Sequence, residues 1–125
     1  MRIQNFEDVI SWQKGRILYI ELSKDFKNIK DYSFKDQMFR AALSITNNIA
    51  EGFDRGSDKE LRQFLIIARG SCAEVRSMLH IAQADGNLTK ERHQELSLLT
   101  VTISKLLTGF IKKLETGDKR PATTQ

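Results

Sequence analysis

Apolar residues recur at intervals of three and four along most of the chain, which is the spacing of one face of an α-helix. The pattern is clearest from Asp58 to Asp85, about 40 Å of helix at a rise of about 1.5 Å per residue. Ser57 and Glu60 form a capping-box pattern at its start, and Gly86 supplies a stop after it. Its apolar positions are Leu61, Phe64, Leu65, Ala68, Ser71, Cys72, Val75, Met78, Leu79 and Ala82.

Three further segments have helical patterns. The first covers residues 5–26, with Asn5 as N-cap, and its apolar stripe is Phe6, Val9, Ile10, Ile17 and Ile20. The second follows a cap at Asp31 or Ser33 and ends near Asp54. The third follows a cap at Thr89, and its seam is Leu96, Leu99, Ile103, Leu106, Phe110 and Leu114.

Four helices with short connections predict an all-α fold, an antiparallel up-down four-helix bundle in which each apolar stripe is buried against the others. No strand pattern competes with this interpretation. We expect residues 1–115 to form a single domain. Residues 116–125 contain no apolar anchor and predict a disordered C-terminal tail.

The first two helices each carry a second group of apolar residues. Trp12, Tyr19 and Phe26 lie nearly opposite the core stripe of the first helix. Phe39, Leu43 and Ala50 form a further group on the second helix. A single bundle would leave such faces exposed, so they predict an oligomer interface between copies of the chain. The residues assigned to this interface are Trp12, Tyr19, Phe26, Phe39 and Leu43.

A polar stripe runs along the second helix beside its apolar stripe of Met38, Ala41, Ile45, Ile49 and Gly52. Its members, with a partner from the third helix at Glu74, are Gln37, Arg40, Ser44, Asn48, Glu51 and Arg55. We expect Glu51 to pair with Arg55, and Glu74 to reach Arg40 or Arg55. The stripe is interpreted as a network that sets helix register; the alternative is a binding strip with two arginine anion anchors.

Composition favours a soluble, cytoplasmic protein. The 125 residues include one cysteine, Cys72, which we expect to be small and buried rather than reactive. Signal-peptide and membrane-spanning patterns are lacking. The net charge of +4 and the isoelectric point near 9.3 admit an anionic partner, and self-association would add the excess charge of every copy to one assembly.

The sequence offers little for catalysis. Inward-facing Glu-x-x-His pairs hold metals in some bundles, but Ser77 precedes His80 by three residues and Lys90 precedes His93. We therefore expect neither histidine to be a metal ligand. The common phosphate-binding and nucleophile motifs are missing, and the sequence predicts no cofactor and no enzyme activity.

Nucleic-acid binding would depend on basic residues of the outer faces. No aromatic RNA-binding motif or helix-turn-helix pattern accompanies them, so binding would rest on the phosphate backbone and on shape. The candidates are Lys14, Lys24, Lys27, Lys59, Arg62, Arg69, Lys105, Lys112 and Lys113.

The pattern of residues from about Asn5 to Leu114 resembles the bacterial four-helix bundle proteins encoded in intervening sequences of 23S ribosomal RNA genes. Thr46 stands where family members often have proline after Ser-Ile, and we expect it to leave the second helix smoother. The resemblance is carried by Phe6-Glu7-Asp8, Trp12-Gln13, Gln37, Arg40-Ala41-Ala42, Ser44-Ile45, Asn48-Ile49-Ala50-Glu51-Gly52, Arg55, Ser57, Phe64-Leu65, Ala68, Gly70-Ser71 and Glu74.

The resemblance implies rings, commonly homopentamers, and a relationship to the accessory protein of diversity-generating retroelements, which binds RNA and a reverse transcriptase. It transfers no catalytic role to the polar stripe. Three hypotheses follow: a ring that binds RNA or a nucleoprotein partner, a protein-interaction adaptor without nucleic-acid binding, and a small-ligand pocket along the polar stripe.

Overall fold

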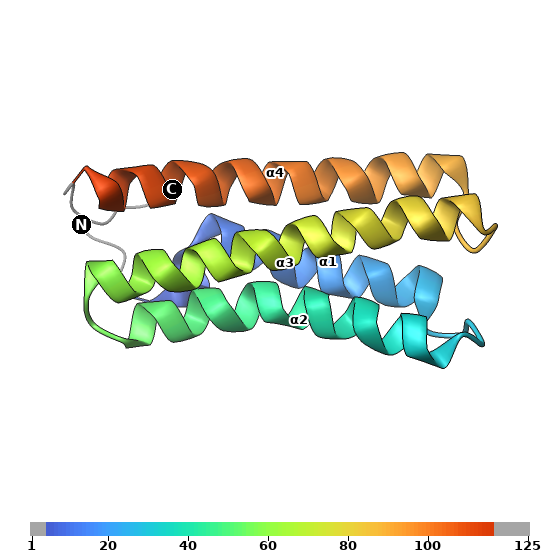
Figure 1. The fold of residues 1–125 in the computed structure, drawn as a ribbon, viewed down its shortest axis with the longest axis horizontal. Coiled ribbons are helices and arrows are strands. Elements are labelled where there is room, and N and C mark those ends of the chain that lie inside the picture. Colours follow the sequence, from blue (N-terminus) through green and yellow to red (C-terminus); the bar gives the residue numbers. More distant parts are fainter. Residues whose placement is uncertain (1–4, 117–125) are drawn as a thin grey trace.

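The computed structural model describes residues 5–116, and these residues are helical throughout apart from short connections (Figure 1). A 3-10 helix, η1 (Phe6–Asp8), precedes four α-helices, and the described part of the chain contains no strand. The prediction of an all-α fold with four helices is therefore confirmed. The α-helices are α1 (Ile10–Phe26), α2 (Tyr32–Asp54), α3 (Asp58–Ala84) and α4 (Lys90–Glu115).

The four helices pack side by side. Helix α2 contacts α1 and α3, and α4 contacts α3 and α1, so each helix has two neighbours. In Figure 1 the chain runs in one direction along α1 and α3 and in the opposite direction along α2 and α4. Each helix therefore buries one face against its neighbours and leaves one face exposed.

Three helices begin at the capping residues that the sequence predicts. The side chain of Asp31 accepts a hydrogen bond from the backbone N–H of Phe34, at 3.1 Å. Ser57 accepts one from Glu60, and Thr89 accepts one from Arg92. Each bond satisfies a backbone donor that the first turn of a helix leaves free.

Glycine ends α3 as predicted. Gly86 has φ of +86°, in the left-handed region that side chains other than glycine rarely occupy. The N–H of Asn87 donates to the carbonyl of Ala82, and the N–H of Gly86 donates to that of Gln83. These two bonds form a Schellman motif, which reverses the chain toward α4.

The prediction for the first helix is wrong in two respects. Val9 is extended, with φ of −80° and ψ of 124°, so it separates η1 from α1, and Asn5 makes no side-chain cap. Ile17 and Ile20 are exposed rather than buried, at 49% and 47%. The buried face of α1 is instead Ser11, Gly15, Leu18, Leu22 and Phe26.

Close packing against α2 explains this choice of face. A Cβ atom at Gly15 would lie 3.0 Å from the Cγ2 atom of Thr46, so α1 approaches α2 at a point where only a small residue fits. Placing Ile17 on this face would turn the glycine away from the contact. The face with the small residues is therefore the one that is buried.

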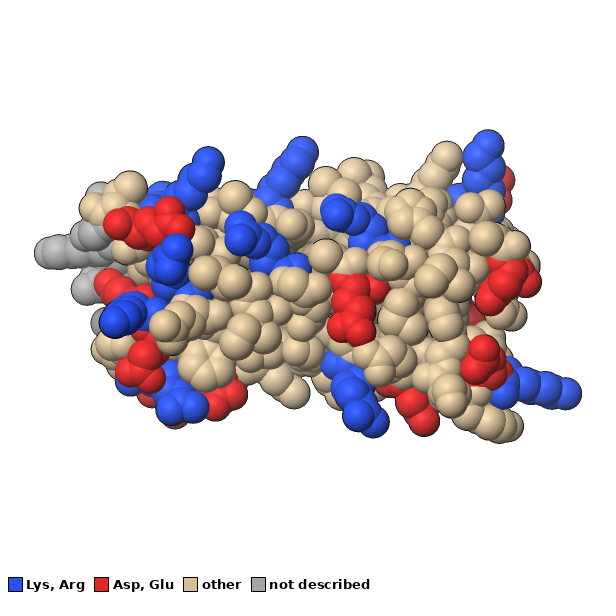
Figure 2. Space-filling model, viewed as in Figure 1, with Lys and Arg blue, Asp and Glu red and all other residues tan. Residues whose placement is uncertain are grey.

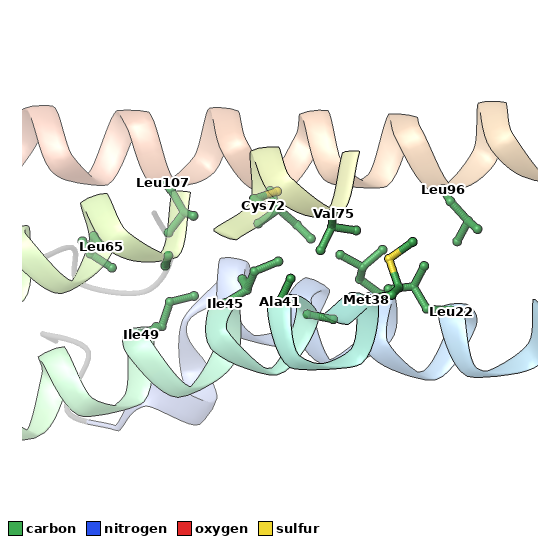
Figure 3. Close-up of a cluster of buried hydrophobic side chains, with 14 of the residues drawn as sticks. Leu22, Met38, Ala41, Ile45, Ile49, Leu65, Cys72, Val75, Leu96 and Leu107 are labelled. Atoms are coloured by element: carbon green, nitrogen blue, oxygen red, sulfur yellow. The ribbon is translucent and has the colours of Figure 1, made fainter. Parts of the chain in front are cut away.

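Side chains of all four helices meet in one core (Figure 3). Leu22 comes from α1, Ile45 and Ile49 from α2, Val75 from α3 and Leu107 from α4. The predicted apolar stripe of α2 is buried at every position. On α4, Thr100 and Leu107 are buried, whereas the predicted Leu99 and Leu106 are only half-buried.

None of the helices in residues 5–116 is both long and apolar enough to span a membrane. The predicted disordered tail lies outside the described residues, except for Thr116.

Candidate functional site

Two members of the polar stripe of α2, Gln37 and Ser44, bond to side chains of α3. The amide nitrogen of Gln37 donates to Glu74 at 2.5 Å, and the hydroxyls of Ser44 and Ser71 lie 2.8 Å apart. The side-chain amide of Asn48 donates to the carbonyl and the hydroxyl of Ser44. The contacts of Gln37 with Glu74 and of Ser44 with Ser71 link α2 to α3, whereas the bonds of Asn48 stay within α2.

The arginines of the polar stripe do not pair with Glu74, so that prediction is wrong. Arg55 donates to Glu51 at 2.9 Å, as predicted, and its guanidinium lies 5.2 Å from the ring centre of Phe64. Eighteen residues of helix, about 27 Å, separate Arg55 from Gln37, which is level with Glu74. Arg40 is exposed, and it forms no ion pair within residues 5–116.

An apolar hollow of about 240 Å³ opens between α1 and α2. Tyr19 packs on Phe39 beside it, with ring centres 5.5 Å apart, and Leu43 is 42% exposed. The lining residues are Trp12, Arg16, Tyr19, Ile20, Leu43 and Thr46. The hollow therefore brings together three of the five predicted interface residues, with a fourth, Phe39, next to them.

Phe26, the fifth predicted interface residue, belongs to the core. Its side chain is fully buried, and its ring centre lies 6.3 Å from that of Phe34. The angular position of Phe26 on α1 lies close to Leu22, on the side that faces the other helices. The assignment of Phe26 to an oligomer interface is therefore wrong.

A second hollow, of about 320 Å³, lies beside η1 and the last turns of α2. It is lined by Asn5, Phe6, Glu7, Ala50, Phe53 and Asp54. Neither this hollow nor the one between α1 and α2 is lined by the polar stripe. The small-ligand hypothesis for the polar stripe gains no support from them.

The basic candidates of α3 and α4 lie on adjoining helices. The guanidinium of Arg62 donates to Glu115 at 2.6 and 3.2 Å, and that of Arg69 donates to the hydroxyl of Thr108 at 3.2 Å. Neither residues 61–73 of α3 nor residues 96–114 of α4 contain any Asp or Glu. We call the surface of these two segments, together with Arg76 just beyond the first segment, the basic face. Its members are Arg62, Arg69, Arg76, Lys105, Lys112 and Lys113.

Figure 2 shows this arrangement over α3 and α4, where Lys and Arg follow one another along the molecule. In this view acidic groups lie at both ends, along the lower edge, and at one place near the middle of the molecule, just below the row of Lys and Arg. The other predicted basic residues are elsewhere: Lys14 and Lys24 lie on α1, Lys27 follows it, and Lys59 occupies the first turn of α3. Lys24 is also paired with Glu21, at 2.7 Å.

Two features of this side of the molecule escaped the sequence interpretation. Arg76 continues the row of Arg62 and Arg69 at a spacing of seven residues, which returns to the same side of a helix. His80 of α3 and His93 of α4 lie in contact, with Nδ1 and Nε2 2.9 Å apart. The sequence does contain a signal for this contact. The two histidines lie equally far along the chain from the turn at Gly86 and Asn87, so they stand level on two antiparallel helices.

Cys72 is buried, as predicted, and its thiol donates to the carbonyl of Thr100 at 3.1 Å. Burial raises the pKa of the thiol to about 11, and the charge of Arg76 lowers it only in part. The reactive thiolate is therefore scarce at neutral pH. The side chain fills core space rather than forming a reactive centre.

Comparison with a solved structure shows a shared fold. A protein of unknown function from the S23 ribosomal protein family of Bacteroides thetaiotaomicron superimposes with a TM-score of 0.78, at 22% sequence identity. The match covers 82% of this chain and 99% of that one. A search of curated proteins gave no match.

Comparison with protein families gives a match over most of the helical region. The family described as 23S rRNA-intervening sequence protein matches residues 7–109, from η1 to the last turns of α4. This confirms the resemblance carried by the Asn48–Gly52 segment and the positions around it. The chain belongs to the 23S rRNA-intervening sequence protein family.

Proposed function

We propose that this chain is a non-enzymatic, self-associating helical protein that binds the phosphate backbone of RNA through its basic face. The single observation that carries the proposal is the acid-free packing of residues 61–73 against residues 96–114. Such a surface attracts a polyanion, because its positive groups are not neutralised by neighbouring carboxylates. Arg62 is the exception, since Glu115 pairs with it.

The side chains available on this face favour contacts with phosphates rather than with bases. The large apolar residues exposed on α3 and α4 are Ile67, Ile81 and Leu98, and none of them is aromatic. Single-stranded RNA is usually held by stacking of bases on aromatic rings. A row of cations without such rings suits recognition by charge and shape.

Self-association would multiply this charge. The apolar hollow between α1 and α2, with Leu43 at its rim, is exposed to solvent in the isolated chain and could be buried against a second copy. Contact through this surface would leave the basic face free, because the hollow is lined by residues of α1 and α2, whereas the basic face lies on α3 and α4. The resemblance to the family implies a homopentameric ring of antiparallel up-down bundles, which would carry five basic faces.

The family's name supports RNA as the anion to test, because it refers to intervening sequences of 23S rRNA. The structure of the S23 family relative adds support for the fold alone. A nucleoprotein or nucleic-acid-processing protein is the second kind of partner that the resemblance implies. Its surface would have to present phosphates or carboxylates to the same basic face.

A matched pair of charge reversals tests the binding face. Lys105→Glu with Lys112→Glu alters the basic face, whereas Lys27→Glu with Lys30→Glu makes the same change of net charge at the turn after α1. We expect only the first pair to weaken binding of a fluorescent RNA hairpin, with the log–log salt slope smaller by about 2. Equal losses in both variants, or no loss in either, would contradict the proposal.

Light scattering tests self-association. We expect Leu43→Glu to give the mass of one chain, 14.4 kDa, where the unaltered protein gives a multiple of it. Leu98→Glu is the control, because Leu98 is still more exposed but lies on α4. An unchanged mass for Leu43→Glu would refute an interface at this hollow.

The same hollow supports the alternative function, an adaptor that docks another protein without binding nucleic acid. In this case Leu43→Glu would abolish capture of the partner protein. The two charge-reversal variants would both capture it as well as the unaltered chain does. Capture that survives nuclease treatment, together with no RNA affinity at low salt, would favour the adaptor over RNA binding.

A further inference from the structure

Contrary to the expectation from the sequence, we infer that His80 and His93 form a two-histidine chelating site for a divalent transition-metal ion at the turn end of α3 and α4. The Nδ1 atom of His80 and the Nε2 atom of His93 lie 2.9 Å apart, and the ring centres lie 4.7 Å apart. His80 is exposed and His93 is half-buried, so an ion could reach the pair from solvent. Imidazole is the commonest side-chain ligand for such ions.

The turn between the helices holds the two rings at this separation. The Schellman bonds of Gly86 and Asn87 fix the end of α3, and the cap formed by Thr89 fixes the start of α4. Leu88, between them, is buried. The backbone positions of the two histidines are therefore set before any ion binds, which reduces the ordering cost of chelation.

The spacing of the two nitrogens matches a chelating pair. Metal–nitrogen bonds of about 2.0–2.1 Å at a right angle place two nitrogens about 2.9 Å apart. In the metal-free pair one ring donates a hydrogen bond to the other. To bind an ion, the donor ring must carry its proton on its other nitrogen, and both rings must turn their lone pairs to a common point.

The ligand set selects the kind of ion. Within residues 5–116 no group of three or more His, Cys, Asp and Glu side chains is placed to hold a metal, so water must complete the coordination. A right-angled pair with open positions suits the square-planar or octahedral geometry of Cu²⁺ and Ni²⁺ better than a closed zinc site. Arg76 and Lys90, one turn before each histidine, will weaken the affinity by repulsion.

The composition of the chain makes this inference easy to test. His80 and His93 are its only histidines, and its only cysteine is buried in the core. Metal binding that depends on histidine can therefore be assigned to this pair alone. The inference does not rest on the proposed RNA binding, because the pair lies outside the basic face.

The experiment is calorimetric titration of the tag-free protein with NiCl₂ at neutral pH, followed by His80→Ala, His93→Ala and the control Gln94→Ala. We expect one Ni²⁺ per chain, affinity at least about tenfold weaker in each histidine variant, and no change in the control. Affinity should fall in acid, because protons compete for the same nitrogens. Equal affinity in the unaltered protein and either histidine variant would overturn the inference.

A second measurement does not depend on the heat of binding. Ni²⁺ should raise the thermal unfolding temperature of the unaltered protein and of Gln94→Ala, since it binds only the folded pair. Neither histidine variant should respond. If Ni²⁺ leaves the unfolding temperature of every protein unchanged, or raises that of all four proteins equally, His80 and His93 form only a hydrogen bond between two helices.

Discussion

Arg92 on α4 holds Asp25 on α1 by two hydrogen bonds to one carboxylate oxygen, from Nη2 at 2.7 Å and from Nε at 3.0 Å. The same guanidinium also pairs with Glu21 and Glu95. The hydrogen bond with Asp25 is the main reason that the pKa of Arg92 is raised. These bonds join the end of α1 to the start of α4, which are far apart in the sequence.

Replacing Arg92 should destabilise the fold. In Arg92→Met the methylene packing is kept, but Asp25, with a side chain only 21% exposed, loses its partner. We expect the free energy of unfolding to fall by about 1–2 kcal/mol, measured by urea denaturation. Lys24→Met is the control, since Lys24 is 64% exposed and should matter much less. Equal effects of the two changes would contradict the role given to Arg92.

Stability should also depend on the ionisation of Glu21. The hydrogen bond from Lys24, followed by the charges of Lys24 and Arg92, lowers the pKa of Glu21 below its ordinary value of 4.5. A lowered folded-state pKa stabilises the protein above the unfolded pKa, and this stability is lost as pH falls through the folded value. Urea denaturation at pH 7 and at decreasing pH below 4.5 measures this loss. The free energy of unfolding should fall less with pH in Glu21→Gln than in the unaltered chain. The same pH profile in both proteins would rule out this contribution.

Two glycines in helices should respond to alanine in opposite directions. A Cβ at Gly52 would lie 2.8 Å from the Cβ of Phe64, an atom close to the backbone that cannot easily move, so Gly52→Ala should cost about 1–3 kcal/mol. A Cβ at Gly70 meets nothing within 4 Å, so Gly70→Ala should stabilise by about 0.5–1 kcal/mol. Thermal denaturation of both variants measures the difference, and a stabilising Gly52→Ala would show that α2 and α3 pack less closely.

Cys72 should be inert in the folded protein. Its pKa of about 11 and its burial predict almost no labelling by iodoacetamide at pH 8, and rapid labelling once urea unfolds the chain. Mass spectrometry follows the reaction directly. Rapid labelling without denaturant would place Cys72 outside the core.

The sequence predicts α2, α3 and α4 well because side chains near the start of each helix determine where it begins. Asp31, Ser57 and Thr89 cap helices through side chains that bond within the same turn. The buried face of α1 depends instead on the close approach at Gly15, which involves α2. Periodicity alone does not distinguish two apolar faces of one helix, so the sequence favours a face of α1 that is exposed in the structure.

In the candidate sites, too, some features follow from the sequence pattern and others depend on tertiary packing. The basic residues of α3 and α4 are visible in the sequence, and the seven-residue spacing that adds Arg76 is visible as well. The bond from Gln37 to Glu74 depends on which side chains lie level across two packed helices. That relationship needs the tertiary structure, as does the burial of Phe26.

The salt dependence of RNA affinity tests the central proposal most directly. Anisotropy of a fluorescent RNA hairpin measures affinity for the unaltered protein from about 50 to about 200 mM salt. Contact between the basic face and about five phosphates predicts that affinity falls linearly on a log–log scale, by about 100- to 500-fold over this range. No binding at the lowest salt concentration, or an affinity that does not change with salt, would contradict RNA recognition by the basic face.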